Sequence, residues 1–269
     1  MEKKFYTGKY DRVFKTILCD EDNKEILQEF LSRILKKKVE VVEILKNELP
    51  VVNVIERTKT VDVLVKVDEE YVHIELNSQN KDYLHTRNFI FFTSIYNKKT
   101  KKGDAYDLKT KFIHLDFTYK LDDNKDYRKY YIQDDENKRY LDIIEIIEFN
   151  MDKIMEYWYN DNEEKIDEYK HLIMLDLEKE GLEKLSEGDD FVKEYEERLN
   201  KLNEDETFQS AMTYEEDQEL IRNTEKNQAY DNGKLESKIE IAKSLLENNI
   251  DINIISKSTG LSIDEINKL

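Results

Sequence analysis

Two acidic residues, Asp62 and Glu75, lie on adjacent segments that both alternate as β-strands do. In VDVLVKV (61–67) and YVHIELN (71–77) a two-residue period sends successive side chains to opposite faces of the strand. The valines of the first segment form its apolar face, so Asp62 belongs to the other face. A three-residue polar turn joins the segments into a predicted β-hairpin, on which we expect Asp62 and Glu75 to emerge on the same side.

Two carboxylates at that spacing repel each other unless a divalent cation lies between them. Mg²⁺ prefers one or two protein carboxylates, waters and a substrate phosphate, and Mn²⁺ is an alternative with similar ligand preferences. Such an ion can activate water and stabilise the charge that develops on a phosphodiester. The alternative interpretation is structural, because a chain with 61 acidic residues forms many pairs by chance. The spacing alone does not decide between the two.

The elements around the hairpin predict an α/β fold. A hairpin followed by a crossover helix and another strand implies a mixed sheet with helices packed on it. After about residue 150 the sequence is helical throughout, rich in Lys and Glu and without alternation. The other expected elements are helices over 23–37 and 82–99, strands over 39–45 and 111–119, and strand candidates at 129–133 and 141–149.

The charge of the chain is unevenly distributed. The net charge of −18 argues against a nucleic-acid partner at first sight, because DNA binding gains affinity from neutralised phosphates. Residues 1–133, however, hold 26 basic and 23 acidic residues, a net charge of +3, whereas residues 134–269 hold 17 and 38, a net charge of −21. The acidity therefore belongs to the second half of the chain.

Cysteine content and hydropathy indicate the compartment. The one cysteine, Cys19, cannot form an intramolecular disulfide, which is typical of an intracellular protein. No stretch reaches 18 apolar residues, so we expect no membrane partner and a cytoplasmic location. The chain also has no glycine-rich phosphate loop, which disfavours an ATPase or a dinucleotide enzyme.

Several short motifs in order resemble the PD-(D/E)XK nuclease family transposases, also called the Rpn group of recombination-promoting nucleases. The family's D-x-x-F-K start resembles DRVFK (11–15), and its I-E-x-Q strand resembles the segment around Glu75. The resemblance covers most of the chain. Its remaining parts are the Asp-bearing strand VDVLV, Arg87 and Tyr96 on the next helix, Gly103 and Tyr106 in a G-x-x-Y loop, and the tail IAKSLLENNIDINIISKSTGLSIDEINKL.

The resemblance implies that Asp62 and Glu75 bind the metal. The third site position, Gln in this family and Lys in the wider superfamily, is Asn77 here. Asn can hydrogen-bond an attacking water or a phosphate oxygen, but it is a methylene shorter than Gln and uncharged. Gln79, two residues further along the same strand face, is an alternative for this role. The departure leaves open a weakened or inactive enzyme.

Supporting residues carry two interpretations each. Asp11 is either a further acidic residue near the site, as the first helix of this fold often supplies, or a helix cap. Arg87 either clamps a phosphate or forms a salt bridge that orients Glu75. Tyr96 is a further supporting candidate but is more typical of a core aromatic. For His73 we favour a half-exposed strand residue over a metal ligand or DNA contact. The lysines Lys98, Lys99, Lys101 and Lys102 either track a DNA backbone or form ordinary solvated surface.

The C-terminal segment INIISKSTGLSIDEINKL has the pattern of two short helices around a TGL turn, as in a helix-turn-helix. Its second helix holds two acids and one lysine, a charge that would repel phosphates. We therefore favour a packing or oligomerisation element there, with a homo-oligomer formed through the helical region. The acidic stretch at about 150–235 is interpreted as a solvated helical domain rather than an interaction arm or a DNA mimic.

Together these observations predict a restriction-endonuclease-like mixed sheet flanked by helices at residues 1–150, followed by an acidic all-helical region at residues 151–269. The predicted activity is that of a Mg²⁺-dependent DNA endonuclease, a hydrolase linked to recombination, mobile elements or defence against foreign DNA. The alternative is a catalytically inactive nuclease fold that acts as a DNA- or protein-binding module, which the asparagine at position 77 favours.

Overall fold

The computed structural model describes residues 4–20, 24–45, 48–49, 59–60, 63–68, 70–77, 81–99 and 110–269. Its strands are β1 (Val41–Leu45), β2 (Glu48–Leu49), β3 (Lys59–Thr60), β4 (Val63–Val67), β5 (Glu70–Asn77), β6 (Phe112–Thr118), β7 (Tyr127–Tyr130) and β8 (Ile144–Asn150). Its helices are α1 (Asp11–Leu18), α2 (Lys24–Leu35), α3 (Leu84–Lys99), α4 (Met151–Tyr159), α5 (Glu163–Ile173), α6 (Lys179–Leu185), α7 (Asp190–Glu204), α8 (Glu206–Glu247), α9 (Ile252–Thr259) and α10 (Ile263–Ile266).

A mixed sheet with strand order β1-β4-β5-β6-β8-β7 organises the first part of the chain. The predicted hairpin is present: β4 and β5 pair antiparallel, with Val63 opposite Ile74. The strand after α3, β6, then lies parallel to β5, and β8 lies parallel to β6. The expected mixed sheet with helices on it is confirmed, and a helical crossover connects the parallel strands β5 and β6, as this arrangement requires.

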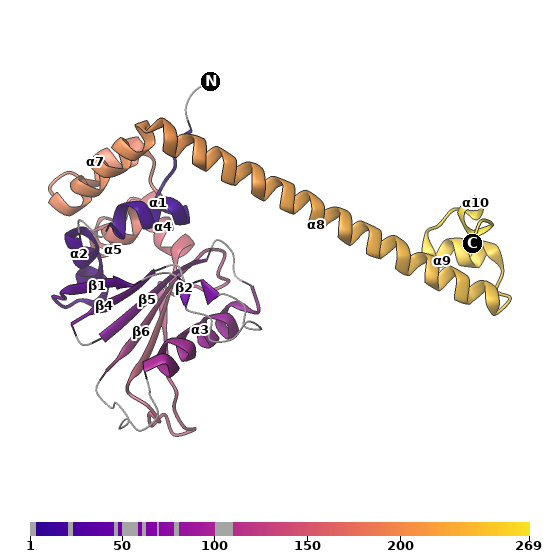
Figure 1. Ribbon diagram of the computed structural model, residues 1–269, viewed down its shortest axis with the longest axis horizontal. Coiled ribbons are helices and arrows are strands. Elements are labelled where there is room, and N and C mark those ends of the chain that lie inside the picture. The colour runs from indigo at the N-terminus through magenta and orange to yellow at the C-terminus, as the bar shows by residue number, and fades with distance from the viewer. Residues whose placement is uncertain are drawn as a thin grey trace. The chain divides into compact units, whose positions relative to one another are not determined.

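One face of the sheet carries the apolar core. Phe14 of α1 and Phe30 of α2 pack their rings against Phe117 of β6, with ring centroids 6.3 and 6.0 Å apart. Phe149 of β8 extends the cluster at 5.6 Å from Phe117. Figure 1 shows α1 and α2 on this side of the sheet and α3 on the other. The valines of β4 belong to the same buried set, as their alternation predicts.

The opposite face of the sheet is polar and is covered by α3. Every residue of β6 is buried, including the polar ones, so neither face of this central strand is open to water. Buried polar groups require hydrogen-bond partners. The covering helix must therefore supply polar side chains as well as packing.

The chain divides into two compact units, Met1–Glu204 and Asp205–Leu269. The first contains the sheet together with α4 to α7, and the helical content expected after residue 150 is confirmed. Helix α4 starts directly after β8, where the Asn150 side chain caps it by accepting a hydrogen bond from the Lys153 backbone N–H. The predicted division at residue 150 thus falls at the end of the sheet, and its status as a functional boundary stays a prediction.

The second unit contains α8, α9 and α10, and its C-terminal part has its own small core. Ala242, Ile255, Leu261 and Ile266 are buried together there. The turn between α9 and α10 begins at Gly260 in the left-handed conformation, with φ of 70°, which glycine adopts at low cost. The helix-turn-helix pattern predicted for this segment is therefore present in the fold.

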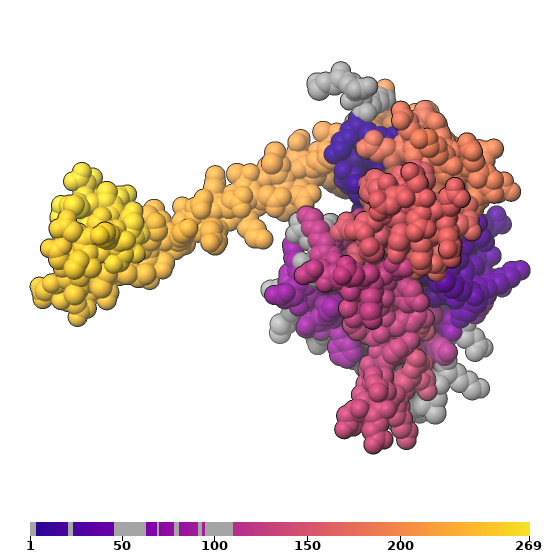
Figure 2. Space-filling model, turned by 180° about the vertical axis from the view of Figure 1, so that it is seen from behind, coloured from indigo at the N-terminus to yellow at the C-terminus, as the bar shows by residue number. Residues whose placement is uncertain are grey.

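The connection between β7 and β8 projects from the first unit (Figure 2). Most of its residues are exposed, and Tyr140 has 80% of its surface accessible. At the base of this projection, β7 pairs antiparallel with β8 through Tyr130 and Ile146. The edge strand therefore places Tyr130 next to the polar face of the sheet.

His171 provides a pH-dependent contribution to stability. Its ring lies 6.3 Å from that of Phe30, and burial, followed by the positive charges of Arg33 and Lys36, lowers its pKa to about 3. The unfolded chain, with a histidine pKa of about 6.5, binds the proton more readily between these values. Stability from this residue is therefore complete above about pH 6.5 and falls as the pH drops toward 3.

Replacing this histidine with an apolar ring should remove that part of the pH dependence. We expect the free energy of unfolding of the wild type to fall by about 2 kcal/mol more than that of His171→Phe between pH 7 and pH 5. Urea unfolding at the two pH values measures the difference. An equal loss of unfolding free energy in both proteins would show that folding does not lower the pKa of His171.

Candidate functional site

Three acidic side chains lie in one row across the polar face of the sheet. Strand pairing places Glu75 of β5 beside Asp116 of β6, and Asp116 beside Glu148 of β8. Adjacent strands are about 4.8 Å apart. All three residues are buried, with 3%, 2% and 2% of their surfaces exposed. Ionised carboxylates at this depth are costly unless cations or hydrogen-bond donors surround them.

The first turns of α3 supply a partner to each member of the row. Arg87 donates to Glu75 Oε2 over 3.1 Å. Asn88 donates to both carboxylate oxygens of Asp116, over 2.8 and 3.0 Å. His85 Nε2 lies 3.2 Å from Glu148 Oε1. One end of the helix therefore crosses all three strands.

Glu75 is held from two directions. His73 Nε2 lies 3.0 Å from Oε1, and Arg87 pairs with Oε2. The Arg87 side chain remains one-third exposed, at 34%, whereas the Glu75 side chain is 4% exposed. Of the two interpretations of Arg87, the salt bridge that orients Glu75 is therefore present in the structure. Both oxygens of this buried carboxylate are thereby engaged.

Asn77 connects Glu75's arginine to the next acid in the row. Its side-chain oxygen accepts a hydrogen bond from Arg87 over 2.9 Å, and its amide nitrogen donates to Asp116 Oδ1 over 3.0 Å. The residue is buried, with 4% of its surface exposed. Both ends of the side chain thus bond within the protein.

A pair of histidines lies one step along the same face. His73 and His114 approach with their Nδ1 atoms 2.8 Å apart. Burial, followed by the charge of His114, holds the pKa of His73 well below its ordinary value. A neutral His73 whose Nε2–H donates to Glu75 must accept at Nδ1, so we assign the shared proton to His114. The expectation of a half-exposed His73 is wrong, because only 2% of its surface is exposed and its ring lies between Glu75 and His114 of β6.

His114 also sets the charge state of Asp116. Its Nε2 lies 3.1 Å from Asp116 Oδ2, within ion-pair distance but without hydrogen-bond geometry. Burial acts most strongly on Asp116 and would raise its pKa. The charge of His114, followed by the hydrogen bonds from Asn88, outweighs the effect of burial, so the pKa of Asp116 lies below the ordinary value. Asp116 is therefore an anion at neutral pH.

Glu148 is enclosed by hydroxyl groups. Tyr130 donates to Oε2 over 2.6 Å, and Thr118 donates to Oε1 over 3.3 Å. Burial and this bond to Glu148 raise the pKa of Tyr130 well above its ordinary value, so the phenol keeps its proton. His85, by contrast, is open to solvent, with 60% of its side chain exposed. A buried carboxylate thus holds an exposed imidazole in place.

Several predicted site residues lie outside the described residues: Asp62, Gln79, Lys101 and Lys102, together with Gly103 and Tyr106. Tyr96, Lys98 and Lys99 belong to α3, but the description stops at their backbone. Asp11 occupies the first turn of α1 and pairs with Lys15 over 2.7 Å, whereas Tyr10 is the N-cap. Asp11 is therefore not the N-cap of α1, as one interpretation had it, and the role of Asp11 in a site stays a prediction.

Sequence reasoning missed Asp116 and Glu148. Each is an acid inside an otherwise apolar strand, in FIHLDFT and IEIIEFN, which is an unusual place for a charge. That signal was present in the sequence. Their position beside Glu75 could not be inferred from the sequence, because it depends on the parallel register of strands that are distant in the chain.

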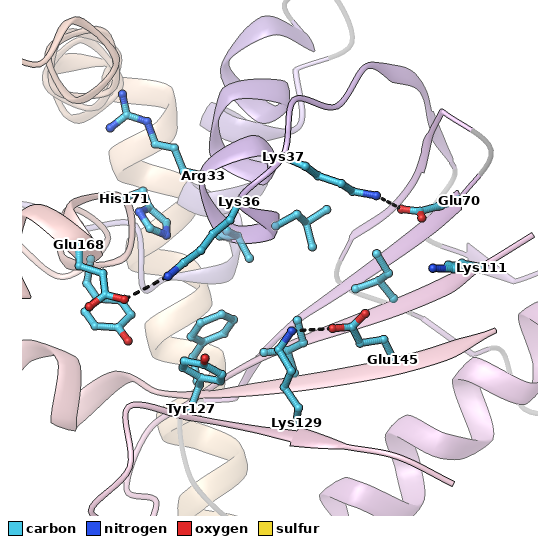
Figure 3. A pocket seen from close by; sticks show the side chains of 16 residues that line it. Arg33, Lys36, Lys37, Glu70, Lys111, Tyr127, Lys129, Glu145, Glu168 and His171 are labelled. Carbon is cyan, nitrogen blue, oxygen red and sulfur yellow. Dashed lines mark hydrogen bonds and ion pairs between the residues drawn. The ribbon is translucent and has the colours of Figure 1, made fainter. Parts of the chain in front are cut away.

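A pocket of about 330 Å³ lies on the opposite face of the sheet near Ile113 and Ile147. Figure 3 shows three lysine–glutamate pairs around it. These are Lys36–Glu168, Lys37–Glu70 and Lys129–Glu145, with N–O distances of 3.1, 2.6 and 2.7 Å. Because each of these lysines already has a carboxylate partner, the pocket is weaker as a phosphate site than its lysine content suggests.

Within the described residues, no cluster of three or more histidine, cysteine or acidic side chains has the arrangement of a metal site. A dication that takes fewer protein ligands is compatible with this finding, because Mg²⁺ retains several waters. No helix in the described part of the chain is long and apolar enough to cross a membrane.

The mixed six-stranded sheet flanked by helices is consistent with the PD-(D/E)XK nuclease fold. The model of the PD-(D/E)XK nuclease family transposases matches residues 8–238, and the chain belongs to this family. The C-terminal helix-turn-helix domain of the Rpn/YhgA-like nuclease family matches residues 235–269. Comparison with curated proteins and with solved structures finds no match.

Family membership indicates a nuclease- or transposase-related function, and nucleases of this kind generally use divalent metals. The helix-turn-helix domain indicates DNA binding. The resemblance inferred from the sequence is thereby confirmed, and so is the helix-turn-helix pattern of the C-terminal segment. The matched domain indicates DNA binding by this segment, whereas its charge had favoured a packing element, and the expected oligomerisation stays a prediction.

Removing the Arg87 guanidinium beside Glu75 should destabilise the protein even when no metal is bound. We expect Arg87→Met to lower the free energy of unfolding by about 2 kcal/mol, because Glu75 and Asn77 each lose a donor in a buried site. The partial exposure of Arg87 keeps this loss below that of a fully buried pair. Urea unfolding in EDTA measures it.

Arg139→Met is the matched control, because Arg139 pairs with the exposed Asp142 on the β7–β8 connection. Its unfolding midpoint should equal that of the wild type. An Arg87→Met protein as stable as this control would show that the Glu75 carboxylate does not depend on the arginine.

Proposed function

We propose that the protein is a Mg²⁺-dependent DNA endonuclease in which Asp62 and Glu75 hold the ion. The observation that supports this most is the buried, doubly held Glu75 on the family's acidic strand. Asp62 directly precedes Val63 in the sequence, and Val63 pairs with Ile74, the neighbour of Glu75. This order supports a second carboxylate close to Glu75.

The chemistry of the donor set is compatible with Mg²⁺ or Mn²⁺. Carboxylate oxygens are ligands that these ions prefer, and the remaining positions go to water and a substrate phosphate. When bound, the ion supplies a more acidic water and charge stabilisation at the phosphodiester. His73 and Arg87 hold the Glu75 carboxylate in one orientation, so little rearrangement is needed on binding.

The other residues of the chain have supporting roles in this proposal. Arg87, one-third exposed beside Glu75, braces the carboxylate and presents charge toward a phosphate. Asn77 or Gln79 positions water or a phosphate oxygen. Asp11 and Tyr96 are supporting residues at the edge of the site. Lys98, Lys99, Lys101 and Lys102 track the DNA backbone.

We place this activity in DNA recombination, mobile-element biology or defence against foreign DNA, and in the cytoplasm. The family of transposase nucleases and the C-terminal helix-turn-helix domain support a DNA partner. A homo-oligomer formed through the helical region would bring two nuclease sites to one DNA, so that both strands can be cut in one encounter.

A second candidate function is a catalytically inactive fold that binds DNA or protein. Asn77 favours it, because its side-chain oxygen and nitrogen are both engaged by Arg87 and Asp116 and it is almost fully buried. A residue in that position organises the site internally. Under this alternative, the protein would bind DNA through its helix-turn-helix domain and leave the phosphodiesters intact.

Plasmid cleavage tests the proposal. Supercoiled plasmid is incubated with the wild type, Asp62→Asn and Glu75→Gln in Mg²⁺ or Mn²⁺. We expect the wild type to nick or linearise the plasmid, and each variant to be slower by at least about 100-fold, because each loses a metal ligand. Glu145→Gln, on the opposite face of the sheet, should retain wild-type activity.

The result also decides between the candidates. Cleavage at equal rates by all proteins would mean that the site lies elsewhere. An uncut plasmid with the wild type, together with retained DNA binding, would support the binding module instead.

A further inference from the structure

A small pocket of about 220 Å³ lies beside the acidic row, on the same polar face of the sheet. Strand β6 contributes Asp116 and His114 to it, and β8 contributes Ile146. The remaining lining residues are Asn88, His85 and Phe89 from the first turns of α3, and Tyr130 from β7. Its accessible lining is mostly apolar, although it borders a charged network.

Four aromatic rings line this pocket, those of His85, Phe89, His114 and Tyr130, and hydrogen bonds to Glu148 restrain the rings of His85 and Tyr130. His85 is held by Glu148 and lies 5.6 Å from the ring of Tyr130, tilted by 56°. Tyr130 is held by its own hydrogen bond to Glu148. Phe89 has 47% of its surface exposed, which is high for an apolar ring on a helix that covers a sheet. The rings provide flat surfaces that are open to a ligand.

The chemistry of the lining specifies a planar heterocycle. Aromatic side chains bind nucleobases by stacking, and every base has a face that stacks. The volume of the pocket is below that of typical sites for drug-sized ligands, so it suits one base rather than a base pair.

The position of the pocket connects it to the proposed nuclease site. Asp116 both lines the pocket and accepts from Asn77, next to Glu75 in the network. The strands of Asp116 and Glu75 are neighbours, about 4.8 Å apart. Asn88 also contacts both regions, because it accepts from Arg87 Nε over 3.1 Å. A phosphate near Glu75 would therefore lie within one nucleotide of the pocket.

We propose that this pocket binds a single unpaired nucleobase next to the phosphate at the site, so that the substrate class is single-stranded or locally unpaired DNA. The inference rests on the proposed nuclease function for its link to cleavage. A base within a duplex is stacked and paired and must be extruded before it can enter such a pocket. Unpaired DNA enters without that cost.

Fluorescence of 2-aminopurine tests the inference without cleavage. The full chain is titrated, in Ca²⁺, with a single-stranded oligonucleotide that carries one 2-aminopurine, and with the matching duplex. We expect the single strand to bind about tenfold more tightly than the duplex, with a change in fluorescence when the base stacks on the rings. Phe89→Ala should lose about tenfold in affinity for the single strand and most of the fluorescence change.

Phe89→Trp, which keeps a stacking ring, and Tyr140→Ala, on the exposed β7–β8 connection, should behave as the wild type. Thermal unfolding checks that each variant is folded. The inference would be overturned if folded Phe89→Ala bound the single strand as tightly as the wild type does. It would also be overturned if the wild type bound the single strand and the duplex equally tightly with no change in fluorescence.

The same proteins separate this inference from the nuclease proposal. If plasmid cleavage depends on Glu75 but no 2-aminopurine signal is seen, the base-pocket inference is wrong and the nuclease proposal stands. If the 2-aminopurine signal depends on Phe89 but the protein cuts no DNA, the base pocket is supported and the nuclease proposal is wrong.

Discussion

Burial of the carboxylate row is the constraint on which the rest of this structure depends. Glu75, Asp116 and Glu148 lie side by side on three central strands, almost without exposure. An ionised carboxylate is stable in such a place only when cations and donors satisfy its oxygens. The first turns of α3 provide a cation, an amide and an imidazole in one segment. The position of this helix is thereby fixed by charge as well as by packing.

In this arrangement the two faces of one sheet have different roles. The face around Phe117 holds the apolar core and contributes stability. The face around Asp116 holds a connected polar network, which keeps Glu75 oriented at one end and His85 exposed at the other. Such networks give defined geometry when every member has a partner. The proposed metal ligand, Glu75, and the proposed base-binding pocket therefore lie next to each other on one connected network.

The sequence was informative where the physical signal is local. The hairpin of β4 and β5, the helix that contains Arg87 and the strand after it follow from short-range periodicity, and the structure has them all. The ion pair between Arg87 and Glu75 was one of two interpretations that the order of motifs allowed. Family motifs read from the sequence agree with the family that matches residues 8–238.

What the sequence lacked is the register between distant strands. His73 and His114 are 41 residues apart in the chain and meet only because β5 and β6 are parallel. Glu148 joins the row through the next parallel strand. His73 was expected to be half-exposed, because alternation marks the two faces of a strand but not what covers each face. The cover over this face, α3, became visible only in the fold.

Metal binding by the intact protein tests the central claim most directly. Isothermal titration calorimetry with Mn²⁺ should give one site per chain in the wild type and in Glu145→Gln, and no measurable binding in Asp62→Asn or Glu75→Gln. Binding that persists unchanged in both of those variants, or a wild type that binds no ion with or without DNA in calcium-free buffer, would contradict the account.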